Sequence, residues 1–180
     1  MRKTVFLDRD GTINVEKDYL YQIKDFEFID GVVDAIRGLN EVGYFVVVVS
    51  NQSGVARGYY TEEDVELLHR HIAGLLEKNG ARVDAWLFCP HHPEGRGRYS
   101  LQCDCRKPLP GMLIEAARRY DIDLGASIMI GDKLADIDAG ISAGCRTILV
   151  RTGYGAEHER LVSSSTDVYD DLPAAVKSLL

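Results

Sequence analysis

Positive charge is the first thing that this sequence has little of. Its 180 residues contain 21 Lys and Arg against 28 Asp and Glu, which gives a formal net charge of −7 at pH 7. Proteins that bind nucleic acids or anionic membranes usually carry a basic face. The charge balance therefore argues against both kinds of partner.

Long apolar runs are also missing. The longest, residues 44–49, is six residues, whereas a membrane-spanning helix needs about 20. The residues up to Asp8 lack the apolar core of a secretory signal. We therefore expect a cytoplasmic protein with no membrane partner.

Cysteine is scarce as well, with four residues in the chain. That is too few for a disulfide scaffold, and disulfides are rare in cytosolic proteins. Yet Cys89, Cys103 and Cys105 all lie within one span of seventeen positions. In the cytosol such clustering favours a metal site or catalysis over disulfides.

What is present is an ordinary globular composition, with 46% apolar and 27% charged residues. A chain of this length can bury about two-thirds of its unfolded surface around one core. No repeat, low-complexity tract or linker divides it. We therefore expect a single domain over residues 1–180.

Short apolar runs alternate with amphipathic segments along the chain. The run 45–49 is continuously apolar, as in a strand buried on both faces. Thr61 with Asp64 predicts a capping box at one helix start. Strands alternating with helices predict an α/β fold, a doubly wound parallel sheet flanked by helices. We expect strands over 4–8, 44–50, 85–90, 127–132, 145–151 and 167–170, and helices over 31–41, 61–79, 110–120, 134–142 and 173–180.

Two carboxylates follow the first predicted strand. Asp8 and Asp10 are two residues apart and precede Gly11. Ligands of open α/β sheets bind beyond the carboxyl ends of the strands, so this pair lies where chemistry takes place. Two acids this close repel each other unless they share a cation or a proton. Mg²⁺ together with a phosphate would satisfy them.

Further polar groups end other strands or precede helices. Ser50 begins a Ser-Asn-Gln-Ser-Gly segment, whose hydroxyl and backbone amides suit phosphate oxygens. Arg106 and Lys107 are adjacent cations that could bind a phosphate. Asp132 ends another strand, where it is either a cap of the next helix or a third ligand of the cation.

The coincidence of these groups is more informative than any one of them. Along the chain they read acid-x-acid, hydroxyl, cation, acid, with three of them at the ends of different strands. This order resembles the haloacid dehalogenase (HAD) superfamily of phosphatases over residues 5–151. The matching residues are Asp8-Arg9-Asp10-Gly11-Thr12, Ser50-Asn51, Lys107 and Gly131-Asp132 with Asp136.

The resemblance implies hydrolysis of a phosphate monoester through an aspartyl-phosphate. Asp8 would be the nucleophile, Asp10 the general acid and base, and Mg²⁺ would be held by Asp8, Asp10 and Asp132. Ser50 and Lys107 would hold the phosphoryl oxygens, and Asp136 would support Lys107 or the helix start. The implied partner is a small sugar bisphosphate. Its expected binding residues are Glu16, Asp18, Tyr19, Asn51, Gln52, Ser53, Arg106 and Lys133.

Some members of this superfamily insert a separate cap domain after the first or second motif. The segments 11–29 and 51–61 are too short to hold one. We therefore expect an uncapped site in which loops select the substrate.

The clustered thiols share their segment with two adjacent histidines. Three thiolates and one imidazole suit tetrahedral Zn²⁺, and four protein ligands leave no open position, so the metal would be structural. Because Cys105 directly precedes Arg106 and Lys107, zinc in the loop 89–105 would fix where these cations point. The expected ligands are Cys89, Cys103, Cys105 and either His91 or His92; spacing does not choose between the histidines, and the resemblance favours His91.

Four other functions remain open at this point. One is a zinc-scaffolded binding module, which would not need Asp8, Asp10 and Asp132 on one edge of the sheet. Histidinol-phosphate phosphatases share the catalytic core and a similar zinc loop. A phosphatase of polynucleotide ends is disfavoured by the charge of −7. A phospho-accepting receiver domain also combines acids, a hydroxyl and a Lys, but its accepting Asp lies on a later strand than its acid pair. A monomeric enzyme with a small-molecule partner and no nucleic acid is our expectation.

Overall fold

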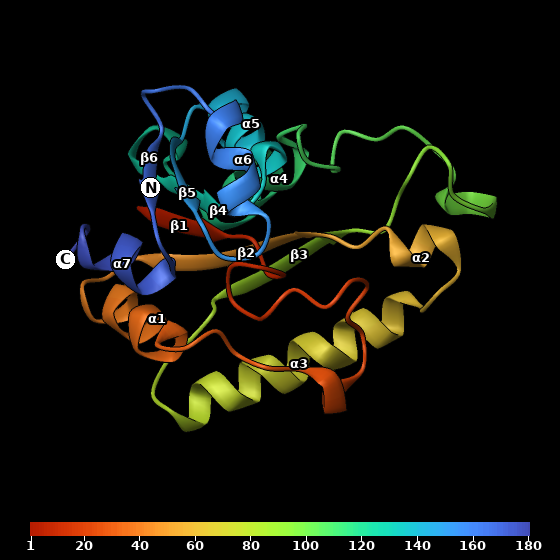
Figure 1. Ribbon diagram of the computed structural model, residues 1–180, viewed down its shortest axis with the longest axis horizontal. Helices are drawn as coiled ribbons and strands as arrows, with labels where there is room; N and C mark the ends of the chain where they lie inside the picture. The colour runs from red at the N-terminus through yellow and green to blue at the C-terminus, as the bar shows by residue number, and fades with distance from the viewer.

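A parallel sheet of six strands runs through the centre of the computed structural model, which describes residues 1–180 (Figure 1). The spatial order of the strands is β3-β2-β1-β4-β5-β6, and every neighbouring pair is parallel. The strands are β1 (Thr4–Leu7), β2 (Phe45–Asn51), β3 (Ala85–Cys89), β4 (Ile128–Gly131), β5 (Arg146–Val150) and β6 (Asp167–Tyr169).

Helices cover both faces of the sheet, so the predicted doubly wound α/β fold is confirmed. In Figure 1, α1, α3 and α7 lie on one side and α4, α5 and α6 on the other. The helices are α1 (Val32–Glu41), α2 (Gly54–Arg57), α3 (Glu62–Lys78), α4 (Gly111–Tyr120), α5 (Leu134–Ala143), α6 (Gly155–His158) and α7 (Leu172–Lys177). Short 3-10 turns span Ile23–Asp25, Gly97–Tyr99, Leu124–Ala126 and Glu159–Leu161.

The central strands are apolar on both faces because both faces are covered. Val5 and Leu7 pack into the core under α1, α3 and α7. Phe6, between them, packs with Val47 and Val49 into the core under α4. This alternation of successive side chains is the period of a strand, and it accounts for the continuous apolar runs in the sequence.

The direction in which successive strands are added to the sheet reverses beside β1. From β1 it builds outward through β2 and β3, then returns to place β4 on the other side of β1. Such a switch point leaves a crevice outside the carboxyl ends of the two central strands, where ligands of open sheets bind. Asp8 follows β1 and Asp132 follows β4, so both acids lie at this crevice.

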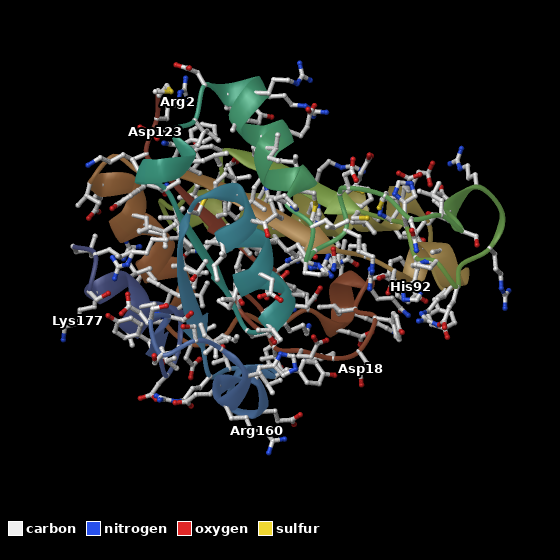
Figure 2. All side chains as sticks on the ribbon, turned by 90° about the horizontal axis from the view of Figure 1, so that it is seen from above. Arg2, Asp18, His92, Asp123, Arg160 and Lys177 are labelled. Atoms are coloured by element: carbon white, nitrogen blue, oxygen red, sulfur yellow. The ribbon has the colours of Figure 1, made fainter.

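No separate domain covers the crevice. Between β1 and α1 the only ordered element is the turn Ile23–Asp25, and between β2 and α3 it is α2. Figure 2 shows Asp18 and His92 toward one end of the molecule, with Arg2 and Asp123 toward the other. The β1–α1 loop and the segment after β3 therefore lie at the same end, beyond the carboxyl edge of the sheet.

The predicted elements match the structure within a few residues. The capping box is present at the start of α3, where Thr61 Oγ1 accepts from the Asp64 N–H at 3.2 Å and Asp64 Oδ2 accepts from the Thr61 N–H at 2.9 Å. The short helices α2 and α6 were not predicted. The structure has no helix that is both long and apolar enough to cross a membrane.

Candidate active site

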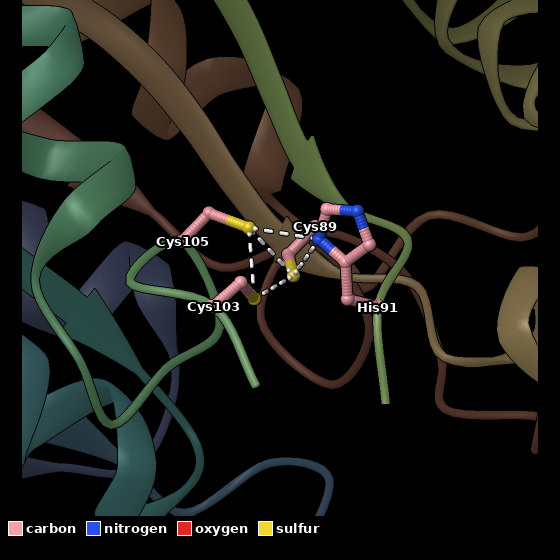
Figure 3. A group of neighbouring side chains, drawn as sticks. All are labelled: Cys89, His91, Cys103 and Cys105. Atoms are coloured by element: carbon pink, nitrogen blue, oxygen red, sulfur yellow. Dashed lines mark hydrogen bonds between the residues drawn. The ribbon is translucent and has the colours of Figure 1, made fainter. Parts of the chain in front are cut away.

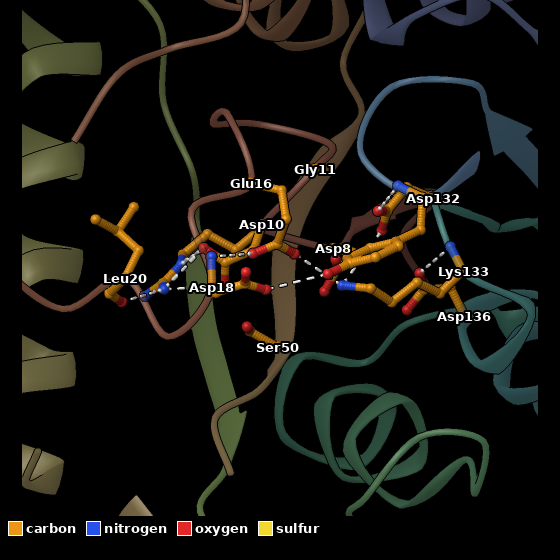
Figure 4. A network of polar contacts seen from close by, with 12 residues as sticks. Asp8, Asp10, Gly11, Glu16, Asp18, Leu20, Ser50, Asp132, Lys133 and Asp136 are labelled. Carbon is orange, nitrogen blue, oxygen red and sulfur yellow. Dashed lines mark hydrogen bonds and ion pairs between the residues drawn. The ribbon is translucent and has the colours of Figure 1, made fainter. Parts of the chain in front are cut away.

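Three carboxylates meet at the switch point of the sheet (Figure 4). Asp8 and Asp132 follow β1 and β4, and Asp136 lies in the first turn of α5. One oxygen of each lies within 4.8 Å of the others. All three residues are buried, with at most 5% of their surface exposed. The strand-end argument predicts Asp8 and Asp132 here, whereas Asp136 from α5 takes the place expected for the Asp10 carboxylate.

Lys107 is the cation inside this cluster. Its Nζ lies 2.6 Å from Asp8 Oδ1 and 2.7 Å from Asp136 Oδ1, and it donates to the Val49 carbonyl at 2.7 Å. Burial alone would lower the pKa of Lys107, but the two carboxylates outweigh it and raise the pKa. Lys107 therefore stays charged and fixed in place by three partners.

Asp136 holds Lys107 and the start of α5 at once. Besides its ion pair with Lys107, its Oδ2 accepts from the Lys133 N–H at 3.0 Å. Both supporting roles expected for Asp136 are present.

Asp132 is fully buried, and its carboxylate is incompletely satisfied. Its Oδ2 accepts from the Tyr154 N–H at 2.9 Å, whereas Oδ1 has no hydrogen-bond partner. The residue that precedes α5 is Lys133, so Asp132 does not cap this helix. Of the two interpretations of Asp132, the ligand interpretation agrees with the geometry.

Lys107 alone does not offset the buried negative charge of these three acids. Burial, Asp8 and Asp136 raise the pKa of Asp132 to about 8. Burial raises the pKa of Asp8 to about 6, against the opposing effect of Lys107. A hard divalent cation takes oxygen ligands and favours their ionised form. Asp132 Oδ1 accepts no hydrogen bond, and its nearest cation is Lys133 Nζ at 3.9 Å, so this oxygen, beside a second acid, fits a cation such as Mg²⁺.

Asp10 points away from this cluster and is held by donors. Arg9, which is fully buried, donates to both carboxylate oxygens at 2.9–3.2 Å. Asn14 Nδ2 and Gln52 Nε2 each donate to it at 3.0 Å. Burial opposes ionisation, but Arg9 and these hydrogen bonds lower the pKa of Asp10.

The residues of the Ser-Asn-Gln-Ser segment, 50–53, make different contacts. Ser50 is buried and its Oγ accepts from Gln52 Nε2 at 2.7 Å. The Asn51 side chain bonds the backbone of Lys107 in both directions, at 2.9 and 3.1 Å. Ser53 faces the cavity described next. The side chain of Asn51 thus positions the backbone that carries Lys107.

A polar cavity of about 280 Å³ opens beside these groups. Lys133 forms an ion pair with Glu16 across it at 3.0 Å, and the Tyr154 hydroxyl donates to Asp18 at 3.1 Å. Burial opposes the charge of Lys133, but Asp8, Asp132 and Glu16 raise its pKa. The cavity is lined by Asp10, Glu16, Asp18, Tyr19, Asn51, Gln52, Ser53, Tyr60, Lys133 and Tyr154.

Arg106 is the one expected substrate residue directed elsewhere. Its Nη1 donates to the His91 carbonyl at 3.4 Å, and it does not line the cavity. Arg57 lies 3.5 Å from His92 Nε2. Burial, Arg106 and Arg57 all lower the pKa of His92. Arg106 and Arg57 therefore place positive charge beside the segment that follows β3.

The cysteine cluster is assembled as the sequence predicts (Figure 3). The sulfurs of Cys89, Cys103 and Cys105 lie 2.9–3.5 Å apart and form no disulfide. His91 Nδ1 lies 3.4 Å from Cys105 Sγ and 3.8 Å from Cys89 Sγ. His92 instead accepts from the Glu94 N–H. Three sulfurs and one nitrogen converging in this way are compatible with structural zinc, with His91 as the imidazole.

Two tyrosines of the cavity were missed by the sequence analysis. Tyr60 donates to Gln52, and Tyr154 contributes both its N–H to Asp132 and its hydroxyl to Asp18. Tyr154 belongs to a Gly-Tyr-Gly segment shortly after β5, which ends at Val150, at the same carboxyl edge. That position is the signal that could have identified it, whereas nothing in the sequence marks Tyr60.

Comparisons with known proteins agree with this geometry. A family model described as HAD-hydrolase-like matches residues 104–175. The D-glycero-beta-D-manno-heptose-1,7-bisphosphate 7-phosphatase of Haemophilus influenzae is 45% identical and covers 99% of both chains. The protein of the same name from Escherichia coli K12 is 47% identical over 96% of this chain and 93% of its own.

A solved structure also has this fold. The D,D-heptose 1,7-bisphosphate phosphatase from B. bronchiseptica, complexed with magnesium and phosphate, superposes with a TM-score of 0.89 at 37% identity. The match covers 98% of this chain and 97% of that one. Magnesium, one of the two ligands named for that relative, is a cation that the acid cluster described above would suit.

Proposed function

The chain belongs to the family of D-glycero-beta-D-manno-heptose-1,7-bisphosphate 7-phosphatases within the HAD-like hydrolases, and we propose that it removes the 7-phosphate of a D-glycero-D-manno-heptose 1,7-bisphosphate. The neighbourhoods of Arg9, Asn51 and Arg106 in the sequence favour this member of the superfamily over a histidinol-phosphate phosphatase. The observation that best supports this proposal is the Asp8–Lys107–Asp136 group beside the Asp132 carboxylate oxygen that accepts no hydrogen bond.

Asp8 is the nucleophile in this proposal. An oxygen of its carboxylate attacks phosphorus, the bond to the sugar oxygen breaks, and an aspartyl-phosphate forms. Asp10 gives a proton to the departing sugar alkoxide. It then takes one from the water that cleaves the aspartyl-phosphate, which releases inorganic phosphate and restores Asp8.

The phosphoryl group needs positive partners in a crevice lined by acids. Lys107 is buried and charged there, and the Ser50 hydroxyl and the Asn51 backbone amide lie at the end of the adjacent strand. Asp8, Asp132 and the backbone carbonyl of Asp10 would hold Mg²⁺. When bound, Mg²⁺ supplies positive charge that stabilises the transferring phosphoryl group.

The cavity residues receive the sugar. Glu16, Asp18, Tyr19 and Ser53 come from two loops that line it. Carboxylates and hydroxyls of this kind suit the hydroxyl groups of a heptose. Lys133, on the α5 side, supplies charge for an anionic ligand, and Arg106, which lies outside the cavity lining, would add to this charge.

Zinc acts indirectly in this proposal. The four ligands leave no position for substrate, so the metal orders the segment after β3. Cys105 immediately precedes Arg106 and Lys107, so closing the loop fixes both. Loss of zinc would then weaken substrate binding without removing the nucleophile.

The remaining context follows from the chemistry. The heptose 1-phosphate product keeps its anomeric phosphate and suits later activation by a nucleotide. A phosphatase of such an intermediate would work in the cytoplasm, as a single domain over 1–180 and as a monomer. The sheet, which draws strands from both ends of the chain, supports the single domain.

The test is a comparison of substrates with Mg²⁺ present. The α and β anomers of the heptose bisphosphate, histidinol phosphate and fructose bisphosphate would be assayed for phosphate release. Phosphorus NMR of the product would show which phosphate remains. We expect the heptose bisphosphate to give the highest kcat/KM with loss of the 7-phosphate. Preference for histidinol phosphate would overturn the substrate assignment.

A further inference from the structure

Gln52 lies between the Asp10 carboxylate, which acts as acid and base in the proposed reaction, and the Ser50 hydroxyl, which holds the phosphoryl group. It is 2% exposed. Its Nε2 donates to Asp10 Oδ2 at 3.0 Å and to Ser50 Oγ at 2.7 Å, and its Oε1 accepts from the Tyr60 hydroxyl at 2.7 Å. A primary amide nitrogen carries two N–H donors, and both are used. Gln52 therefore has no donor left for a substrate.

The orientation of this amide is fixed by its partners. Turning it over would bring Oε1 against the Asp10 carboxylate, which only accepts hydrogen bonds. Tyr60 closes the other side: it is buried and stacked on Tyr21 at 5.1 Å between ring centroids. Its ring also fills the space that a Cβ on Gly54 would need, with a separation of 2.2 Å. The Tyr60 hydroxyl therefore cannot easily leave Gln52.

We propose that Gln52, held by Tyr60, is a positioning residue that sets the Asp10 carboxylate relative to Ser50 for hydrolysis of the aspartyl-phosphate. A single nitrogen bonds both groups, so one atom fixes their separation. The inference rests on the proposed function, in which Ser50 holds the phosphoryl group and Asp10 is the base. It changes the expected role of Gln52 from contacting the substrate to placing the base.

The step concerned is the second half of the reaction. The oxygen of water bonds to phosphorus while the bond from phosphorus to Asp8 breaks, and that electron pair returns to the Asp8 carboxylate. The proton of the water goes to Asp10. Inorganic phosphate leaves, and no further reactant is needed. A displaced Asp10 would slow this step, because general-base catalysis needs the base within hydrogen-bond reach of the water.

The experiment uses Gln52→Leu, which keeps the bulk of the side chain but forms no hydrogen bonds. The substrate is 4-nitrophenyl phosphate, whose leaving group departs without a proton. Its rapid release therefore reports phosphorylation of Asp8, and its steady release reports hydrolysis. We expect a burst near one equivalent of nitrophenol per enzyme, followed by a kcat lowered by about tenfold or more.

The ratio kcat/KM separates positioning from binding. It covers only the steps up to phosphorylation of Asp8, so we expect it to change by less than about threefold while KM falls together with kcat. Tyr60→Phe, which keeps the ring, should show the same pattern with a smaller effect. Gln22→Leu is the matched control, because Gln22 bonds the hydroxyl of Tyr21 and has no hydrogen bond to Asp10, Ser50 or Tyr60, and it should behave as wild type.

A raised KM with a lowered kcat/KM and no burst would overturn the proposal, since this is the signature of a lost substrate contact. Wild-type kinetics in both Gln52→Leu and Tyr60→Phe would overturn it as well. If Gln52→Leu does not fold, Tyr60→Phe alone decides. Failure of the proposed function would appear differently, as a wild-type protein in which no phosphate can be trapped on Asp8.

Discussion

His69 should make the protein lose stability in mild acid, and removing it should cancel a defined part of that loss. His69 lies on α3 and is 5% exposed, packed against Trp86 with ring centroids 4.7 Å apart. Its Nε2 has no hydrogen-bond partner. Burial and the nearby charge of Arg9 lower the pKa of His69 from 6.5 to about 3.

The sign follows from which state binds the proton. Between pH 6.5 and about 3 the unfolded chain protonates His69 and the folded protein does not, so stability rises with pH in this window. At pH 5, about 1.5 units below the unfolded pKa, the unfolded state gains about 2 kcal/mol, at 1.36 kcal/mol per unit. Wild type should therefore lose about 2 kcal/mol through His69 between pH 7 and pH 5.

The assay is urea unfolding of wild type and His69→Leu at pH 7 and pH 5. Asp8 and Asp132 have raised pKa values, so they act in the opposite direction over this range. Their effects occur in both proteins and cancel in the comparison. His71→Leu, on the same helix but partly exposed, controls for loss of a histidine from α3. Equal losses of stability in wild type and His69→Leu would refute the reasoning.

Three other perturbations address the site and its support. Asp8→Asn should fold, by circular dichroism, and lose turnover by on the order of 10⁴-fold or more; near-wild-type activity would exclude the covalent mechanism. Cys105→Ser should lose zinc by elemental analysis and raise KM for the heptose bisphosphate by about tenfold or more, and an unchanged KM without zinc would contradict the indirect role of the metal. Gly131→Ala would place a Cβ 2.3 Å from Asp136 Oδ2, so urea unfolding should show a free energy of unfolding lower by about 3 kcal/mol or more. Gly74→Ala, with open space on α3, should raise that free energy by up to about 1 kcal/mol. Similar effects of the two changes would count against the crowding argument.

Strands and helices were predictable here because local patterns and tertiary packing agree. The continuous run of valines in β2 is what a strand covered on both faces requires, and Thr61 with Asp64 forms the expected cap. The general rule for the carboxyl edge of a parallel sheet then placed Asp8 beside Asp132. Each of these predictions needs only a local pattern and one rule of topology.

Side-chain partners across loops could not be predicted in the same way. The hydrogen bond from the Tyr154 hydroxyl to Asp18 joins two segments that meet only once the sheet is formed. Tyr60 reaches Gln52 because Gly54 leaves room for its ring, which no periodicity encodes. Arg106 is a case in which a contact expected from the sequence is absent. Although it is next to Lys107 in the chain, it donates to the His91 carbonyl and does not reach the cavity. Such contacts depend on loop paths set by the whole fold.

The pairing of its cations explains how a chain with a net charge of −7 can bind an anionic substrate. Lys107 is held by Asp8 and Asp136, and Lys133 is held by Glu16. These carboxylates reduce the net field of the site, yet they fix each ammonium group before the substrate arrives. Preorganised charge costs little further reorganisation when phosphate charge develops. The placement of a few cations held by carboxylates, rather than the total charge, therefore decides whether this crevice accepts a phosphate.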